Sequence, residues 1–255
     1  TDIVLKHKKI LSLSKKLEVE ITNYISKFWN ELKSVTKESN LTDLEDRMLN
    51  EIKQILKKFH HIDVYTGYQL IAEIWKNSLF HDTELIANEG FYNVGRMRVP
   101  NIVAKGTGKS KREEQDGWNG KMIPNEIIAQ LLYSEELKAL DNKRNKIQEL
   151  EMELTDLVEA AKVEDSEEND ALYDIVKKDK DDEPSDSFDK STLMSELKGT
   201  DKKSEKYKWL KKVDHLLTTS QALSKELKNE EKELWNAVQE RILTLTDEEI
   251  DKMVK

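Results

Sequence analysis

The chain has 255 residues, of which 36% are charged, and only 8 are glycine and 3 are proline. So few turn-forming residues cannot supply the many tight connections of a β-sandwich, barrel or propeller, so the composition predicts a mainly α protein. The lack of cysteine excludes a disulfide scaffold, a cysteine nucleophile and any metal site with thiolate ligands.

The net charge of −9 is unevenly distributed along the chain. Residues 163–189, the acidic segment, contain 12 acidic and 3 basic side chains, and the rest of the chain is balanced at 39 of each. Residues 96–121, the basic segment, contain seven lysines and arginines against three acids. The sequence therefore combines one acidic and one basic segment with a neutral helical background.

The hydropathy of the chain and its first residues bear on the cellular location of the protein. No apolar run approaches the roughly 18 residues of a membrane span, and no signal peptide opens the chain. We therefore expect a cytoplasmic protein without a membrane partner. Because the chain begins at Thr1 and ends soon after a new helix start, it also reads as an excised piece of a longer protein.

Residues 1–89 predict a packed helical unit. Apolar residues recur at three- and four-residue steps over about 3–35, 44–59 and 66–79, which gives each helix one apolar face. A short fourth helix is expected over about 83–87. Thr42 and Glu45 have the spacing of a capping box at the start of the second helix.

Residues 90–124 differ from the rest, because six of the eight glycines and two of the three prolines fall there. This composition predicts a long basic loop region with short strands at 91–94 and 101–103. A loop of this length inside a compact protein is usually functional or flexible.

Residues 125–255 predict an antiparallel hairpin of two long helices, at about 125–161 and 205–243. The acidic segment between them has few large apolar groups and is therefore predicted to be mobile, with a short helix after it at 191–197. Thr246 and Glu249 form a second capping box, which begins a last helix.

The apolar stripes of the two long helices are a candidate partner interface. The helix at 125–161 has apolar residues at heptad spacing. In the helix at 205–243 the apolar stripe is less regular, because Ser220, Ser224 and Glu231 interrupt it. Two helices alone would leave such stripes partly exposed, so further helices of a partner could cover them, although the stripes could also simply pack on each other. The candidate residues are Leu140, Ile147, Leu154, Leu217, Leu227 and Leu234.

The basic segment contains the candidates for contact with nucleic-acid phosphates, namely Lys105, Lys109, Lys111 and Arg112. The alternative is a solvated loop whose cations pair with the chain's own acids. Residues 106–110 (GTGKS) resemble the end of a phosphate-binding P-loop, but Val103 occupies the position of its first glycine, which argues against a nucleotide site.

No other motif assembles an active site. His60 and His61 are adjacent and diverge on a helix, and His81 has no convincing third ligand nearby. The sequence shows no nucleophile elbow and no glycine-rich dinucleotide fingerprint. We therefore expect neither a metal site nor catalysis in this chain.

Five stretches in series resemble one protein family: 63–75 (DVYTGYQLIAEIW), 81–86 (HDTELI), 109–118 (KSKREEQDGW), 123–127 (IPNEI) and 238–250 (VQERILTLTDEEI). They are similar to the methylation (M) subunit of type I restriction–modification enzymes, in the region after its methyltransferase domain. The resemblance covers most of the chain from residue 63 onward.

The resemblance implies that the parent protein is an S-adenosylmethionine-dependent DNA adenine-N6 methyltransferase. It would work on double-stranded DNA in a complex with a specificity (S) subunit, a restriction (R) subunit and a second M subunit. The family's catalytic Asn-Pro-Pro-aromatic motif is absent here, because Pro100, Pro124 and Pro184 are isolated. This chain is therefore expected to bind no cofactor, to be no enzyme by itself, and to dock the methyltransferase onto the S subunit and DNA. The alternative is an independent helical coiled-coil protein, structural or regulatory, with no link to DNA.

Overall fold

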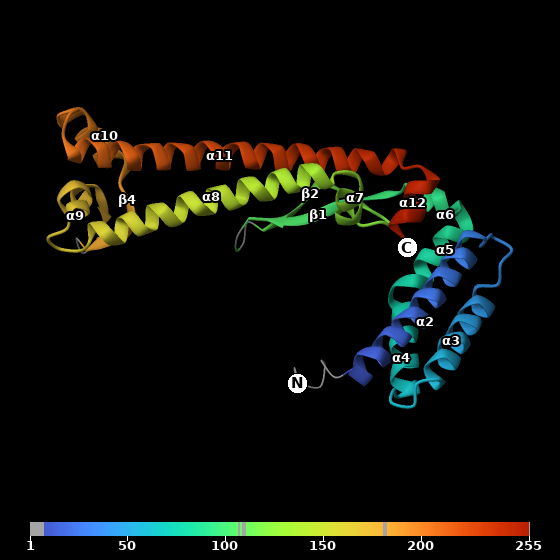
Figure 1. Ribbon diagram of the computed structural model, residues 1–255. Coiled ribbons are helices and arrows are strands. Elements are labelled where there is room, and N and C mark those ends of the chain that lie inside the picture. Colours follow the sequence, from blue (N-terminus) through green and yellow to red (C-terminus); the bar gives the residue numbers. More distant parts are fainter. Residues whose placement is uncertain (1–7, 107, 109–110, 181–182, 255) are drawn as a thin grey trace. The chain divides into compact units, whose positions relative to one another are not determined.

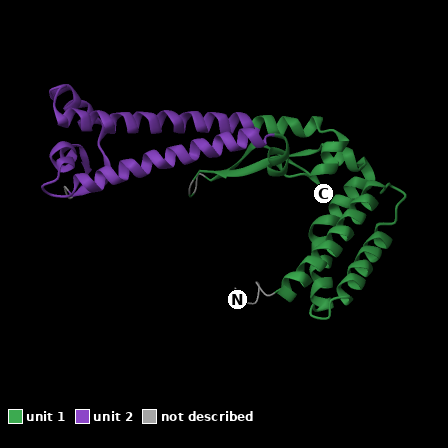
Figure 2. Cartoon of the chain, viewed as in Figure 1, with its two compact units in different colours: residues 1–132, 236–255 green, residues 133–235 purple. Residues whose placement is uncertain are grey.

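The computed structural model describes residues 8–106, 108, 111–180 and 183–254 (Figure 1). The expected mainly α fold is confirmed: long and short helices are joined by two small antiparallel sheets of two strands each. The chain divides into two compact units, of which unit 1 contains residues 1–132 and 236–255 and unit 2 contains residues 133–235 (Figure 2). In the sequence, unit 2 thus lies between the two segments of unit 1. The division of the chain into consecutive segments at 1–89, 90–124 and 125–255 does not predict this arrangement. No helix in the described ranges is both long and apolar enough to cross a membrane.

Unit 1 begins with a group of packed helices, whose apolar stripes meet as the periodicity predicts. Their largest fully buried side chains include Leu32, Ile52 and Trp75. The rings of Phe28 and Trp75 meet edge to face with centroids 6.3 Å apart. The helices are α2 (Lys8–Lys33), α3 (Leu41–Lys57), α4 (Val64–Ile74), the π-helix η1 (Trp75–Leu79), α5 (Phe80–Glu89) and α6 (Phe91–Gly95).

Two local predictions in this helical group are wrong. The cap of α3 is Asn40, whose side-chain oxygen accepts the amides of Thr42 and Asp43, so Thr42 is already inside the first turn and no capping box forms with Glu45. The expected third and fourth helices form one continuous helical stretch from 64 to 89, because η1 joins α4 to α5 without a break.

The basic segment forms a β-hairpin with strands β1 (Arg98–Lys105) and β2 (Arg112–Gly120). Arg98 pairs with Gly120 at one end of the ladder and Lys105 with Arg112 at the other, with an irregularity between Pro100 and Ile102. The strand expected at 101–103 is confirmed and longer, but residues 91–94 lie in helix α6 rather than in a strand. Because β2 is almost entirely polar, its sequence has no hydrophobic alternation that would indicate a strand.

The end of the chain completes unit 1. Helix α11 (Glu205–Arg241) is followed by the 3₁₀ turn η4 (Ile242–Thr244) and helix α12 (Asp247–Met253), and α12 packs against α6 and α7 (Asn125–Leu132). Val94 and Ile250 are fully buried. A Cβ on Gly95 would lie 2.9 Å from Ile250 Cδ1, so the glycine lets the Ile250 side chain pack closely against α6. The capping box of Thr246 and Glu249 is confirmed.

Unit 2 contains α8 (Ser134–Ala161) and α11 (Glu205–Arg241) up to residue 235. These are the predicted antiparallel long helices, and they lie side by side (Figure 1). The expected helix over 125–161 is interrupted at Tyr133, where α7 ends and α8 begins. The short helix expected at 191–197 is confirmed. Between the long helices lie α9 (Glu167–Leu172), the 3₁₀ turn η3 (Tyr173–Ile175), β3 (Val176–Lys178), β4 (Pro184–Phe188) and α10 (Lys190–Gly199).

The acidic segment is folded, so the prediction that it is mobile is wrong. Its apolar residues join a common core with α8, α10 and α11, in which Leu172 and Ile175 are fully buried. The acidic residues lie on the outside of this small core. A few well-placed apolar side chains therefore suffice to order a segment whose composition is typical of disorder. The segment contributes Ala171, Leu172, Ile175, Val176 and Phe188 to the core, and residues 181 and 182 lie outside the described ranges.

Candidate functional site

The structure brings three of the four candidate DNA-contact residues to one end of the β-hairpin. Lys105 and Arg112 form the last pair of the ladder next to the turn, and Lys111 precedes Arg112. Lys109, the fourth candidate, lies outside the described residues. The hairpin thus gathers its cations at an exposed tip rather than spreading them along a loop.

Most cations of the basic segment are paired with carboxylates of the chain itself. Lys105 Nζ lies 3.6 Å from Asp116 Oδ2 and 3.8 Å from Glu114 Oε2, and Arg112 Nη2 lies 2.6 Å from Glu114 Oε1. Lys111 is exposed, and within the part of the chain that the structure describes it forms no ion pair. These pairs are exposed and therefore weak and exchangeable, so the cations remain available to a phosphate. Further pairs join Arg96 to Asp247, Arg98 to Glu240 and Lys121 to Asp82.

The other end of the hairpin is fixed by polar contacts around Trp118. The guanidinium carbon of Arg98 lies 4.6 Å from the centre of the Trp118 ring. The Trp118 amide donates to Gln239 Oε1 at 3.0 Å, and Asn125 Nδ2 donates to the Trp118 carbonyl at 2.8 Å. Asn125 Oδ1 in turn accepts the amide of Gly120 at 3.0 Å. The hairpin therefore has an anchored base and an exposed cationic tip.

The residues that anchor this hairpin do not stand out in the sequence. Arg98 is only one of seven cations in the basic segment. Gln239, which accepts the hydrogen bond from the Trp118 amide, lies 121 positions later in the sequence. The sequence signal available is a lone tryptophan in an otherwise polar stretch, because an isolated large aromatic residue usually packs against something.

The candidate partner-interface residues are largely covered within the chain. Leu140, Ile147 and Leu234 are buried, with 3%, 8% and 7% of their surface exposed. Leu154 and Leu217 are partly buried against the core of unit 2, and Leu227 is partly buried as well. The structure therefore leaves the first three little free surface for a partner, whereas the other three retain some.

Ion pairs join α8 to α11 along the arm that the two helices form. Lys143 Nζ lies 2.5 Å from Glu230 Oε1 and 3.4 Å from Glu226 Oε2. Arg144 Nη2 lies 2.5 Å from Glu231 Oε1, so Glu231, which interrupts the apolar seam in the sequence, is an acceptor for the opposite helix. The hydrogen bond to Glu230 raises the pKa of Lys143. These contacts favour the pairing of α8 with α11 within one chain.

In the described ranges, no group of three or more histidine or acidic side chains is placed to hold a metal ion. No protein-family model, no curated protein and no solved structure matches the chain. Its function is therefore inferred from the sequence resemblance and from the geometry of the two units.

Proposed function

We propose that this chain is the non-catalytic C-terminal region of a type I restriction–modification M subunit, which docks the methyltransferase onto the S subunit and DNA. One observation carries the proposal: all five stretches that resemble the family fall in unit 1, and none falls in the inserted unit 2. Apart from residues 109 and 110, which lie outside the described ranges, these stretches contain α4 with the start of η1, part of α5, most of β2, the start of α7, and the end of α11 with η4 and the start of α12.

Stretches far apart in the sequence contact each other in unit 1. The 109–118 stretch is hydrogen-bonded to the 238–250 stretch through Trp118 and Gln239, and to the 123–127 stretch through Asn125. Arg96, which lies between two of them, donates through Nε to the Leu245 carbonyl at 2.6 Å. Such contacts support the proposal, because they are expected if the resembling stretches form one packed unit.

The partners follow from the resemblance. The S subunit reads the DNA sequence in this family, and the R subunit and a second M subunit complete the complex. S-adenosylmethionine and the target base belong to the methyltransferase domain of the parent protein, so no residue of this chain is assigned to either. We propose that the S subunit contacts the arm where apolar side chains retain free surface, at Leu154, Leu217 and Leu227.

Co-expression with the S subunit encoded beside the parent gene tests the docking role. Leu227→Asp, at a partly buried position, should leave the chain helical by circular dichroism and abolish co-purification with the S subunit. Leu140→Asp is the matched change at a buried position and should lower the helical content itself, because burying a charge without a partner is strongly unfavourable. If Leu227→Asp and Leu154→Asp both stay folded and still co-purify, the S subunit docks elsewhere.

The same proposal assigns auxiliary phosphate contacts to the tip of the β-hairpin. In the assembled complex, changing Lys109, Lys111 and Arg112 to alanine should weaken DNA affinity without altering sequence preference. The slope of log affinity against log salt should flatten by about 0.9 for each phosphate that the variant no longer neutralises. Lys57→Ala, an exposed lysine on α3, is the control and should leave the slope unchanged. An unchanged slope in the triple variant would assign the tip to subunit contacts instead.

A second candidate is an independent helical coiled-coil protein without a DNA link. The burial of Leu140, Ile147 and Leu234 and the ion pairs from α8 to α11 favour it, because they make the arm complete within one chain. The parent gene distinguishes the two candidates. An upstream Asn-Pro-Pro-aromatic motif and a neighbouring S-subunit gene support the first, and their absence supports the second.

A further inference from the structure

The first half of α2 is only partly covered by the rest of the described chain. The buried residues of this 26-residue helix are Tyr24, Phe28 and Leu32, all in its second half. From Lys8 to Asn23 no residue is buried. Leu11 and Val19 expose 46% and 59% of their surface. Because most of the stability of a helix in a protein comes from packing its apolar face, exposed apolar side chains on this half of α2 are suited to contact with a partner.

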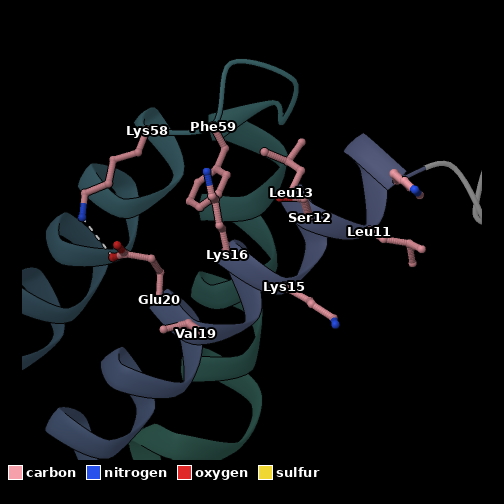
Figure 3. Close-up of a pocket in the computed structure, with 10 residues that line it drawn as sticks. Leu11, Ser12, Leu13, Lys15, Lys16, Val19, Glu20, Lys58 and Phe59 are labelled. Carbon is pink, nitrogen blue, oxygen red and sulfur yellow. Dashed lines mark hydrogen bonds and ion pairs between the residues drawn. The ribbon is translucent and has the colours of Figure 1, made fainter.

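This half of α2 borders a surface groove of about 810 Å³, whose other side is formed by Lys58 and Phe59 directly after α3 (Figure 3). Its lining includes the apolar side chains of Leu11, Leu13, Val19 and Phe59. Phe59 is recessed, with 6% of its surface exposed, whereas Val19 is largely exposed. A recessed aromatic ring beside protruding aliphatic side chains is the form of a groove that accepts one apolar helix face.

The charges around the groove have one dominant sign. Lys8, Lys15, Lys16 and Lys58 line it, against one acid, Glu20. Glu20 is already neutralised by Lys58, whose Nζ lies 3.0 Å from Glu20 Oε2 (Figure 3). The other three lysines form no ion pair among the described residues. An apolar floor with an uncompensated lysine rim is complementary to a helix with one apolar face and acidic flanks.

We infer that this groove is a docking site for an acidic amphipathic helix of a partner protein. The partner's apolar side chains would cover Leu11, Val19 and Phe59, and its carboxylates would face Lys8, Lys15 and Lys16. DNA fits less well, because phosphates gain nothing from the exposed Leu11 and Val19. A membrane fits less well, because a flat surface does not reach the recessed Phe59. The groove is independent of the proposed function, since none of the resembling stretches contributes to this surface.

Fluorescence anisotropy with the full chain tests the site. The probe is a designed helical peptide of about three heptads, with leucine at the two seam positions and glutamate beside them. A second peptide with the same leucines and with lysine in place of glutamate is the matched control. We expect saturable binding of the glutamate peptide and binding of the lysine peptide weaker by roughly tenfold or more, because like charges across an interface are strongly unfavourable.

Variants of the chain then locate the binding. Val19→Asp should abolish binding without changing the circular dichroism, because Val19 is exposed. Ile25→Asp, an exposed apolar position of α2 that does not line the groove, should bind as the unchanged chain does. The double change of Lys15→Glu and Lys16→Glu should reverse the preference in favour of the lysine peptide.

Four results would overturn the inference. Equal binding of both peptides would show an apolar patch without charge selection, and normal binding by Val19→Asp would place the peptide elsewhere. Binding of duplex DNA or of phosphatidylserine vesicles that is lost in Val19→Asp, with no peptide binding, would assign the groove to those ligands. A dimer of the unchanged chain in analytical ultracentrifugation that Val19→Asp dissociates would show that a second copy occupies the groove.

Discussion

The basic and acidic segments have the most uneven charge balances in the chain, and each is ordered by a different kind of contact. In the acidic segment five apolar side chains are buried in the core of unit 2, and the acids remain outside. In the basic segment neither β1 nor β2 contains a buried residue, and the hairpin depends on its backbone ladder and on the contacts around Trp118. The density of charge therefore does not decide whether a segment is ordered. A few apolar residues or an anchored end decide it.

The largest effect is expected from the apolar residues of the acidic segment. Ile175→Ala should lower the free energy of unfolding by about 2–5 kcal/mol, because it leaves a cavity in a fully buried position. Replacing residues 163–189 with a Gly/Ser linker should lower the melting temperature strongly for the same reason. The exposed Glu164→Ala is the control and should stay within about 0.5 kcal/mol. Thermal and urea unfolding measure both, and an unchanged melting temperature in the linker variant would show that the segment does not pack.

A smaller loss is expected at the base of the hairpin. A Cβ on Gly120 would lie 1.9 Å from the backbone oxygen of Ile123, which cannot move as a flexible side chain can. Gly120→Ala should therefore cost about 1–3 kcal/mol, the usual range for overpacking, and should change the fluorescence of Trp118. Gly199→Ala, whose Cβ would meet nothing within 4 Å, is the matched control. Equal effects of the two substitutions would contradict the close approach at Gly120.

A pH-dependent effect is expected at the end of the acidic segment. Asp189 caps α10, and the hydroxyl of Ser191 followed by the amide of Thr192 lower the pKa of its carboxyl to about 2. Because the folded pKa lies below the unfolded one, this stabilisation is present above about pH 4 and is lost as the pH falls towards 2. Asp189→Asn keeps an acceptor without the charge, so its melting temperature should approach that of the unchanged chain over this interval. A constant difference between the two proteins from pH 7 to pH 2 would exclude this role.

The smallest effect is expected from the exposed ion pairs of the hairpin. Lys105→Ala removes the pairs with Glu114 and Asp116, and should change the free energy of unfolding by less than about 1 kcal/mol. Arg98→Ala should cost more, because the Arg98 side chain is only 19% exposed and lies over the Trp118 ring. Urea unfolding at low and high salt compares the two. A larger loss for Lys105→Ala would mean that charge, rather than the anchored base, holds the hairpin.

Part of the candidate site was predictable from the sequence. The clustering of Lys105, Lys111 and Arg112 follows from their closeness along the chain, and the strand at 101–103 from its apolar residues. The anchor of Trp118 was not predictable, because Gln239 and Glu240 reach the hairpin only after the chain has passed through the whole of unit 2. The same holds for the groove beside α2, whose two sides come from positions near 15 and near 58.

The sequence by itself determined the features that depend on neighbouring residues. The helical class, the apolar faces of α3 and α8 and the capping box of Thr246 and Glu249 all follow from spacing within a few turns. Only the tertiary structure decided that Leu172 and Ile175 order the acidic segment, that β2 pairs with β1, and that residues 236–255 complete unit 1. The physical reason is that these features are stabilised by contacts between residues far apart in the chain, and such contacts leave no periodic pattern in the segments that make them.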